Sequence, residues 1–137
     1  MSTTYGPTVN LEQTKKVLAA AEAEAIKQGW NVAVAVVDTA GNLVGFIKRD
    51  DTQSASVLVA QDKARTAALY KRPSKAFQDM VAGGGLGLRV MTMRDVVAAE
   101  GGVPLIVDGK IIGAVGVSGV NSDQDGIVAT AGAAVLA

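Results

Sequence analysis

The sequence contains neither cysteine nor histidine. Without cysteine, the chain cannot form disulfides, use a thiolate nucleophile or hold iron–sulfur and zinc–thiolate centres. Without histidine, it lacks the usual neutral-pH proton shuttle and the Ser-His-Asp and Cys-His arrangements of hydrolases. Any acid–base chemistry therefore falls to Asp, Glu, Lys, Tyr or water, and the sequence predicts no metal site.

Excess charge, aromatic residues and long apolar runs are also scarce. Basic and acidic residues balance at 13 each, which disfavours a nucleic-acid surface or a basic membrane-binding patch. Aromatic residues make up only 4%, too few for base-stacking platforms. The most continuous apolar stretch, residues 127–137, is too short to cross a bilayer core of about 30 Å, and the first seven residues lack a signal-peptide pattern. We expect a soluble cytoplasmic protein without nucleic-acid or membrane partners.

The 137 residues, 49% of them apolar, suffice for one domain with a sizeable core. Asn10 and Gln13 predict a helix start, because each side chain can bind the other residue's backbone N–H, and Gly29 predicts the helix end. Apolar periodicity and turn residues predict the other elements: strands 32–37 and 43–47, a helix from Thr52 or Ser54 to Tyr70, a short helix from Ser74 to Met80, a hairpin over 103–117, and a terminal helix capped by Ser122.

This order of elements predicts an α+β fold, in which an antiparallel sheet of about five strands carries helices on its faces. The second helix has a face of small residues, and the terminal helix is apolar on all sides. A helix that is apolar all round needs burial on more than one side. We therefore expect a homo-oligomer.

Two glycine-containing segments suggest functional motifs. Residues 83–87 lack the Gly-Lys-Ser/Thr continuation and the spacing of phosphate-binding loops, and they predict a mobile connector. Arg89, just beyond them, could meet an anion. Residues 116–120 look like a nucleophile elbow without its last glycine, but no histidine exists to activate the serine. Ser118 is therefore either a turn residue or a hydroxyl that faces a ligand.

Charged residues near strand and helix ends are the other candidates. Arg49 follows a predicted strand, Lys63 lies on the second long helix, and Glu100 precedes the second hairpin. Asp125, in the first turn of the terminal helix, can either accept backbone N–H bonds there or exchange a proton. For each of these charges, a solvated or ion-paired role is the alternative.

Several motifs occur together in a fixed order. They are Asp38-Thr-Ala-Gly-Asn-Leu43, Arg49-Asp50, Asp62-Lys-Ala-Arg-Thr-Ala67, Gly101-Gly-Val-Pro104, Asp108-Gly109, and Gly113 to Gly119 followed by Gln124-Asp125. With this set the sequence resembles the GlcG/HbpS family, also called the haem-degrading domain family, which includes the C-terminal domain of PduO adenosyltransferases. The resemblance covers residues 9–137 as a single domain and leaves residues 1–8 as an N-terminal extension.

The resemblance implies a profilin-like arrangement of α/β/α layers with a five-stranded antiparallel sheet, assembled into a tetramer or an octamer. It also implies haem as a ligand, because some members of the family bind it. The chain departs from the family pattern at residues 49–53, where members often read Arg-Met-Asp-Gly-Ala, and it has no imidazole ligand to offer. Haem iron would need another donor. The conceivable donors are Tyr5, Tyr70, Met80, Met91 and Met93.

Two functions are therefore open. The first is an oligomeric protein that binds haem or a related tetrapyrrole. The alternative is an enzyme that acts by proton transfer or isomerisation on a small carboxylate or an aromatic-derived metabolite. The expected ligand-binding residues are Arg49, Arg89, Gly102 and Ser118. The expected proton-exchanging residues are Lys63, Glu100 and Asp125. A third alternative is a structural oligomer that binds no small ligand. A surface without any enclosed polar cleft would favour this alternative.

Overall fold

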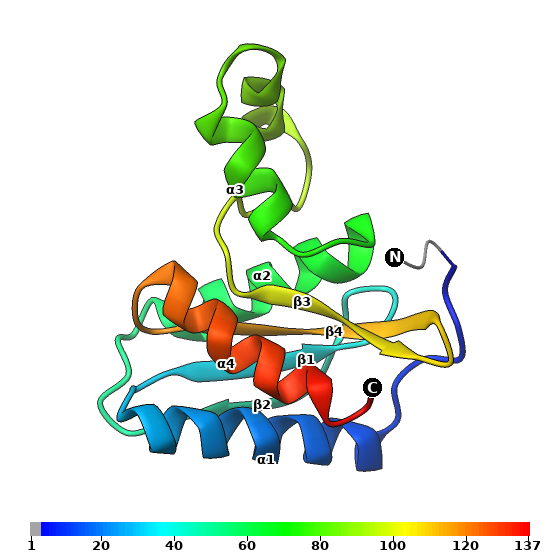
Figure 1. The fold of residues 1–137 in the computed structure, drawn as a ribbon, viewed down its shortest axis with the longest axis vertical. Coiled ribbons are helices and arrows are strands. Elements are labelled where there is room, and N and C mark those ends of the chain that lie inside the picture. Colours follow the sequence, from blue (N-terminus) through cyan, green and yellow to red (C-terminus); the bar gives the residue numbers. More distant parts are fainter. Residues whose placement is uncertain (1–3) are drawn as a thin grey trace.

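The computed structural model describes residues 4–137, and their fold consists of a sheet with helices on both faces and a projecting arm (Figure 1). The elements in chain order are α1 (Leu11–Gln28), β1 (Ala33–Val37), β2 (Leu43–Lys48), α2 (Ser56–Tyr70), α3 (Lys75–Ala82), the 3-10 helix η1 (Gly85–Thr92), β3 (Gly102–Val107), β4 (Lys110–Ser118) and α4 (Ser122–Ala134). None of the helices within residues 4–137 combines the length and apolar character that a bilayer crossing needs.

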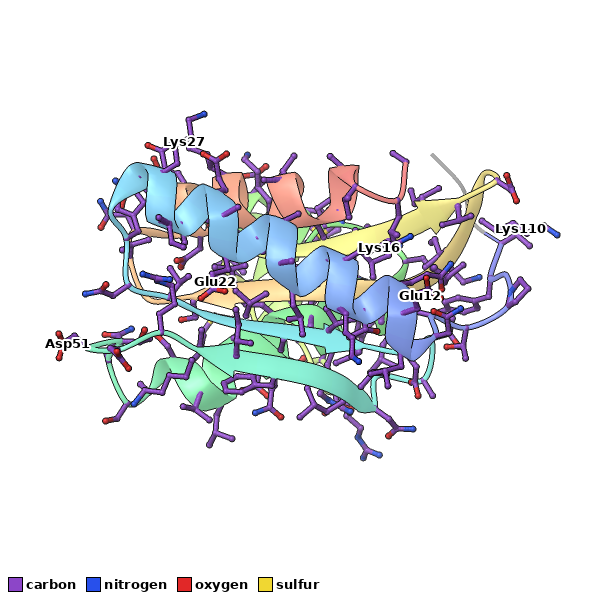
Figure 2. All side chains as sticks on the ribbon, turned by 90° about the horizontal axis from the view of Figure 1, so that it is seen from below. Glu12, Lys16, Glu22, Lys27, Asp51 and Lys110 are labelled. Carbon is purple, nitrogen blue, oxygen red and sulfur yellow. The ribbon has the colours of Figure 1, made fainter. Side chains whose placement is uncertain are left out.

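The sheet is antiparallel, with strand order β2-β1-β4-β3. Helices α1 and α4 lie against each other on one face and α2 covers the other, so the central strand β1 is buried along its whole length. Figure 2 shows α1 from the solvent side, where Glu12, Lys16 and Lys27 lie on its outer surface. The fold is therefore α+β, as the sequence predicted.

Small residues allow α2 to approach the sheet closely. Alanines from α2, β1 and β4 form most of the core on this side of the sheet. At Gly116 of β4 the approach leaves no room for a side chain, because a Cβ atom there would lie 2.1 Å from the Ala60 carbonyl oxygen and 2.5 Å from the Ala64 nitrogen. The predicted small-residue face of this helix thus packs against the sheet.

The expectation of five strands is wrong, because the sheet of residues 4–137 has four. The N-terminal segment runs beside β4 but forms only one isolated parallel bridge, between Tyr5 and Ile111. Pro7 has no N–H to donate and interrupts any longer ladder. The segment is nevertheless bound to β4, since the N–H groups of Gly6 and Val9 donate to the carbonyls of Ile111 and Ile112, both at 2.8 Å.

The structure confirms the predicted ends of α1 and corrects the predicted start of α4. The capping box of Asn10 and Gln13 is confirmed, and Gly29 ends α1 in the left-handed conformation with φ 76°. The cap of the terminal helix is Asn121, not Ser122: its side chain accepts from the Gln124 backbone, one residue earlier than predicted. A polar run offers several caps, and loop geometry decides which side chain reaches the free N–H groups.

Helix α3 and the 3-10 helix η1 form the arm, which we define as residues 75–93 and which projects from the sheet (Figure 1). The connector predicted at residues 83–87 is shorter than expected, because η1 already begins at Gly85. Gly87 packs so tightly on α3 that a Cβ atom there would lie 1.9 Å from the Met80 carbonyl oxygen. The short helix begins after Ser74 as predicted, but the Ser74 hydroxyl makes no capping bond to it and donates to the Ala99 carbonyl at 2.6 Å instead.

Candidate functional site

Most of the predicted site residues gather at one end of the sheet. β3 begins there and β4 ends there, and α2 and the first turn of α4 pack beside them. The predicted residues in this region are Lys63, Glu100, Gly102, Ser118 and Asp125. Arg49 follows β2 at the same end of the sheet but binds Glu22 on α1, and Arg89 lies in the arm. The structure thus brings together five of the seven candidates.

Lys63 and Asp125 form a buried ion pair at the centre of this region. The Lys63 Nζ atom lies 2.9 Å from Asp125 Oδ2 and also donates to the Val117 carbonyl at 3.1 Å. The two side chains are only 4% and 2% exposed. Burial raises the pKa of the Asp125 carboxyl, and the neighbouring ammonium together with the N–H of Val120 opposes part of that rise. The pair joins α2 to β4 and to the start of α4.

Ser118 belongs to a buried hydroxyl pair rather than to an open site. Its Oγ atom lies 2.9 Å from the Oγ of Ser56, which also accepts from Gln53 Nε2 at 2.9 Å. Ser118 lines none of the cavities described below. The hydroxyl therefore joins the end of β4 to α2. Ser118 had been expected to be a turn residue or to face a ligand, and here it does neither.

The glycine cleft is a cavity of about 240 Å³ above the buried ion pair, lined by Pro73, Lys75, Glu100, Gly101, Gly102, Val103, Gly126 and Thr130. The Glu100 carboxylate lies on Gly126, where a Cβ atom would be 2.5 Å from its Oε2 atom. Gly101 separates the cleft from Lys63, because a Cβ atom at Gly101 would lie 2.9 Å from the Lys63 ammonium. Of the predicted residues, Glu100 and Gly102 therefore reach the cleft, and Lys63 and Asp125 lie behind its wall.

Arg49 does not line the glycine cleft. Its guanidinium bonds to the carboxylate of Glu22 on α1, with Nη1 3.0 Å from Oε2. β2, which Arg49 follows, is the edge strand furthest from β3. Arg49, expected to bind a ligand, and Lys63, expected to exchange a proton, are thus engaged with different carboxylates, those of Glu22 and Asp125.

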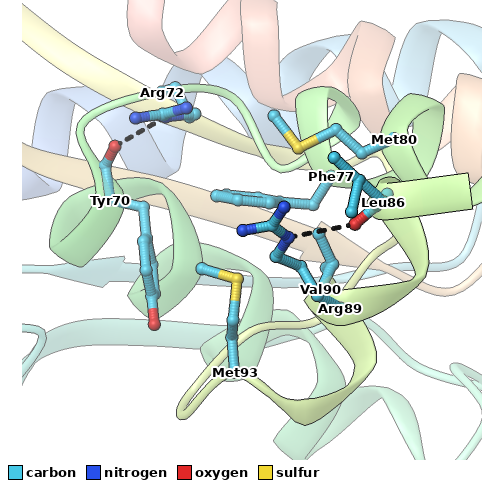
Figure 3. Close-up of a pocket in the computed structure, with 9 residues that line it drawn as sticks. Tyr70, Arg72, Phe77, Met80, Leu86, Arg89, Val90 and Met93 are labelled. Carbon is cyan, nitrogen blue, oxygen red and sulfur yellow. Dashed lines mark hydrogen bonds between the residues drawn. The ribbon is translucent and has the colours of Figure 1, made fainter.

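The arm cavity, between α3 and η1, has a volume of about 360 Å³ (Figure 3). Its lining is largely apolar and carries two guanidinium groups: Tyr70, Arg72, Phe77, Met80, Leu86, Gly87, Arg89, Val90 and Met93. Phe77 and Val90 are buried beneath it. Arg89 was predicted as an anion-binding residue, but Arg72 and Phe77 were missed. The apolar spacing of Phe77 and Met80 on one helical face was the available signal.

Backbone contacts hold both guanidinium groups at the rim of the arm cavity. Arg72 donates from Nε to the Tyr70 carbonyl at 2.9 Å and lies over the Phe77 ring, 5.5 Å from its centroid. Arg89 donates from Nε to the Leu86 carbonyl at 3.2 Å. In both arginines the donor of this hydrogen bond is the Nε atom of the guanidinium group. The cavity therefore combines an apolar floor with two positive charges at its opening.

The chain matches the family model described as "Haem degrading protein HbpS-like" over residues 9–134. It belongs to the HbpS-like family. This HbpS-like protein is 44% identical over 126 residues to the protein GlcG of Escherichia coli K12, with 92% of each chain covered. It is 36% identical over 124 residues to an uncharacterised 15.0 kDa protein from the dhaT-dhaS intergenic region of Citrobacter freundii, covering 89% of this chain and 87% of that one.

Solved structures have the same fold as this HbpS-like protein. HbpS superposes with a TM-score of 0.87 at 31% identity, covering 98% of this chain and 94% of that one. The PduOC:haem complex superposes with a TM-score of 0.83 at 29% identity, covering 93% and 94%. The relationship to the C-terminal domain of PduO that the sequence suggested is thus confirmed.

The residues of the arm cavity fit the group that the family name implies. Three of the five donors expected from sequence line it, namely Tyr70, Met80 and Met93. The Tyr70 hydroxyl is engaged, since it donates to the carbonyl of Arg94. The thioethers of Met80 and Met93 extend into the cavity from two different elements (Figure 3). Thioether sulfur is an accepted axial ligand of haem iron.

The other two expected donors lie outside the arm cavity. The Tyr5 hydroxyl donates to the Ala68 carbonyl at 2.6 Å, and burial raises its pKa. The Lys71 ammonium lies over the Tyr5 ring, 4.7 Å from its centroid. Met91 is 74% exposed on the outside of the arm. Met80 and Met93 are therefore the donors that the geometry favours.

Proposed function

We propose that this HbpS-like protein binds haem, or a related tetrapyrrole, in the arm cavity. The observation that carries the proposal is the composition of that one cavity, where an aromatic floor, two thioethers and two guanidinium groups meet. Ligand pockets of about 300–1,000 Å³ with apolar walls and a few polar groups are typical of small-molecule sites. The family and the PduOC:haem complex among its structural relatives support the same ligand class.

Each part of the cavity has a role toward such a ligand. The ring of Phe77 and the side chain of Val90 offer apolar surface to a flat macrocycle. Arg72 and Arg89 offer charge-assisted hydrogen bonds to carboxylate substituents. Met80 or Met93 would supply the axial ligand, and haem would supply a redox-active iron when bound.

Hemin titration of the purified protein tests this proposal. We expect a Soret band that saturates and co-elutes with the protein in gel filtration. An Arg72→Ala/Arg89→Ala double variant should lose most of the affinity, and Met80→Leu or Met93→Leu should shift the Soret band by removing the axial ligand. Arg94→Ala is the matched control, because Arg94 is an exposed arginine that follows the arm and does not line the cavity. Equal hemin affinity in the double variant and the control contradicts the proposal.

We also propose that the protein is a homo-oligomer, a tetramer or an octamer, with the arm in the interface. Several large apolar side chains of the arm are exposed in the single chain: Leu86 is 79% exposed, Met91 74% and Leu88 50%. Exposed apolar clusters of this kind mark protein contacts. Light scattering after gel filtration should give four or eight times the subunit mass, and Leu86→Glu should lower it. A monomeric wild-type protein contradicts this part of the proposal.

The glycine cleft supports a second candidate function, proton transfer on a small carboxylate. The Glu100 carboxylate lines the cleft opposite Lys75, whose pKa is raised by its bond to Asp79, with a smaller contribution from Glu100. Lys75 would replace Arg49 as the partner of the substrate carboxylate. Glu100→Gln should abolish such turnover and leave hemin binding in the arm unchanged. Turnover that survives Glu100→Gln excludes this second function.

A further inference from the structure

The carboxylate of Glu100 lines the glycine cleft without a partner. Among residues 4–137, no side chain or backbone group hydrogen-bonds or ion-pairs with it, and the residue is half-buried. Lys75, the other charged residue of the lining, differs, because its Nζ atom lies 2.8 Å from Asp79 Oδ2. An ionised carboxylate only accepts hydrogen bonds, so Glu100 offers its acceptor positions to a ligand that donates.

The backbone on both sides of this carboxylate is held in place. The Glu100 N–H donates to Gln78 Oε1 at 2.8 Å. The hydroxyl of Ser74, which is fully buried, donates to the Ala99 carbonyl at 2.6 Å and accepts from the Gly102 N–H at 2.9 Å. A ligand that binds Glu100 therefore does not have to order the loop that carries it, and this lowers the entropic cost of binding.

Carboxylates outnumber ammonium groups in and around the cleft. The ammonium groups of Lys63 and Lys75 each bind one aspartate already. The carboxylate of Glu100 and that of Asp123, in the first turn of α4, have no such cation within the described part of the chain. A ligand whose only charge is a carboxylate is repelled by this excess, and a ligand with a cationic group is attracted.

We infer that the glycine cleft is a binding site for a small amino carboxylic acid, whose ammonium group binds Glu100 and whose carboxylate binds Lys75. The inference names the substrate class of the second candidate function. It rests on that function for the carboxylate at Lys75, whereas the contact with the ammonium group follows from Glu100 itself. Lys75 can serve both anions, because an ammonium group has three N–H donors and Asp79 uses one.

The shape of the cleft suits a ligand of few atoms. Its volume is about 240 Å³, below the roughly 300 Å³ at which pockets for drug-sized molecules begin. Gly126 leaves room for the carboxylate of Glu100, since a Cβ atom there would lie 2.5 Å from Oε2. Pro73 and Val103 add apolar surface, which can contact the carbon chain between the two charged ends of the ligand.

The experiment titrates three compounds into the full chain without hemin and follows the backbone amides of Gly101, Gly102 and Gly126 by NMR. The compounds are 4-aminobutyrate, butyrate and butylamine, which share a carbon chain and differ in their charged ends. We expect 4-aminobutyrate to bind at least about tenfold more tightly than butyrate, because only the former makes a charge-assisted bond to Glu100. Butylamine should bind with intermediate affinity.

Two variants that each remove one negative charge separate a direct contact from a long-range field. Glu100→Gln should weaken 4-aminobutyrate binding about tenfold or more. Asp123→Asn should weaken it no more than about twofold, because Asp123 is exposed, does not line the cleft and is screened by salt. An equal loss in the two variants overturns the inference.

The titration also separates this inference from the function on which it builds. Butyrate binding as tight as that of 4-aminobutyrate overturns the inference and leaves a plain carboxylate as the substrate of the second candidate function. Binding of none of the three compounds overturns the inference as well. Turnover that survives Glu100→Gln excludes the second function instead, whichever compound binds.

Discussion

Replacing Lys63 by methionine should destabilise the protein strongly. The substitution leaves the Asp125 carboxylate buried with the Val120 N–H as its remaining hydrogen-bond donor, 3.1 Å away. Removing one partner of a buried ion pair costs about 3–5 kcal/mol, because the other charge stays in a poor solvent. A domain of this size has about 5–15 kcal/mol of stability in total. We therefore expect Lys63→Met to remove a large fraction of the free energy of unfolding.

The matched control is Lys75→Met, which breaks an ion pair of nearly the same length. Lys75 Nζ lies 2.8 Å from Asp79 Oδ2, but both side chains are more than half exposed. Water solvates the remaining Asp79 carboxylate, so this variant should unfold close to the wild type. Urea denaturation followed by circular dichroism measures both variants. Equal loss of stability in the two would refute the argument, because burial is the main difference between the two pairs.

A double variant tests the origin of the loss. In Lys63→Met/Asp125→Leu both charges are absent, and no unpaired carboxylate remains in the core. This variant should recover part of the stability that Lys63→Met loses. A double variant less stable than Lys63→Met would mean that the methionine and leucine side chains do not fit the space, and the loss could then not be assigned to the charge.

Three further predictions concern other parts of the chain. Gly116→Ala should destabilise the protein by about 1–3 kcal/mol in urea denaturation, because its Cβ atom meets the Ala60 carbonyl oxygen at 2.1 Å. Gly83→Ala, whose nearest neighbour would be at 3.5 Å, should not. Since burial raises the pKa of Asp125 above 3.8, the folded state holds that proton to higher pH than the unfolded state. The stability that this bound proton contributes is present below pH 3.8 and is lost as the pH rises through the pKa of Asp125 in the folded state. Asp125→Asn should therefore flatten this part of the curve of unfolding free energy against pH. Phe77→Ala should cost about 3–5 kcal/mol of unfolding free energy, read by thermal denaturation, and should abolish hemin binding.

Short sequence patterns predicted most of the elements of the body, by which we mean the sheet with α1, α2 and α4. The capping box at Asn10, the left-handed Gly29 and the Asp108-Gly109 turn each act within a few residues, so they are visible in the sequence. Asp108 and Gly109 have φ angles of 51° and 74°, as a type I′ turn requires. The expected count of five strands was wrong: strand patterns occur at only four segments of the sequence, and the segment through Tyr5 adds a single bridge to β4 rather than a fifth strand.

The site was harder to predict than the fold. Lys63 and Asp125 were both predicted as site residues, and the structure brings them together although they lie 62 positions apart in the chain. Their charge pattern could not show that they neutralise each other behind Gly101. Phe77 was missed because the apolar face of α3 becomes a cavity wall only when η1 folds against it, and the glycine-rich sequence before η1 predicted no helix. Arg72 precedes α3, and no pattern in the sequence links it to the arm.

The projecting arm also affects how the sequence of such a protein can evolve. The two core clusters that stabilise the sheet and its covering helices include no residue from the arm. Of the buried side chains of the arm, Phe77 also contacts the end of α2, where its ring meets Tyr70 edge-on with 5.2 Å between the centroids. Mutations there act far from the residues that stabilise the sheet, and distant substitutions add nearly independently. The arm can therefore acquire new linings, and with them new ligand preferences, at little cost to the folding of the body. Relatives with the same sheet can accordingly differ in what they bind, because the residues that select the ligand and those that fold the chain occupy separate parts of the molecule.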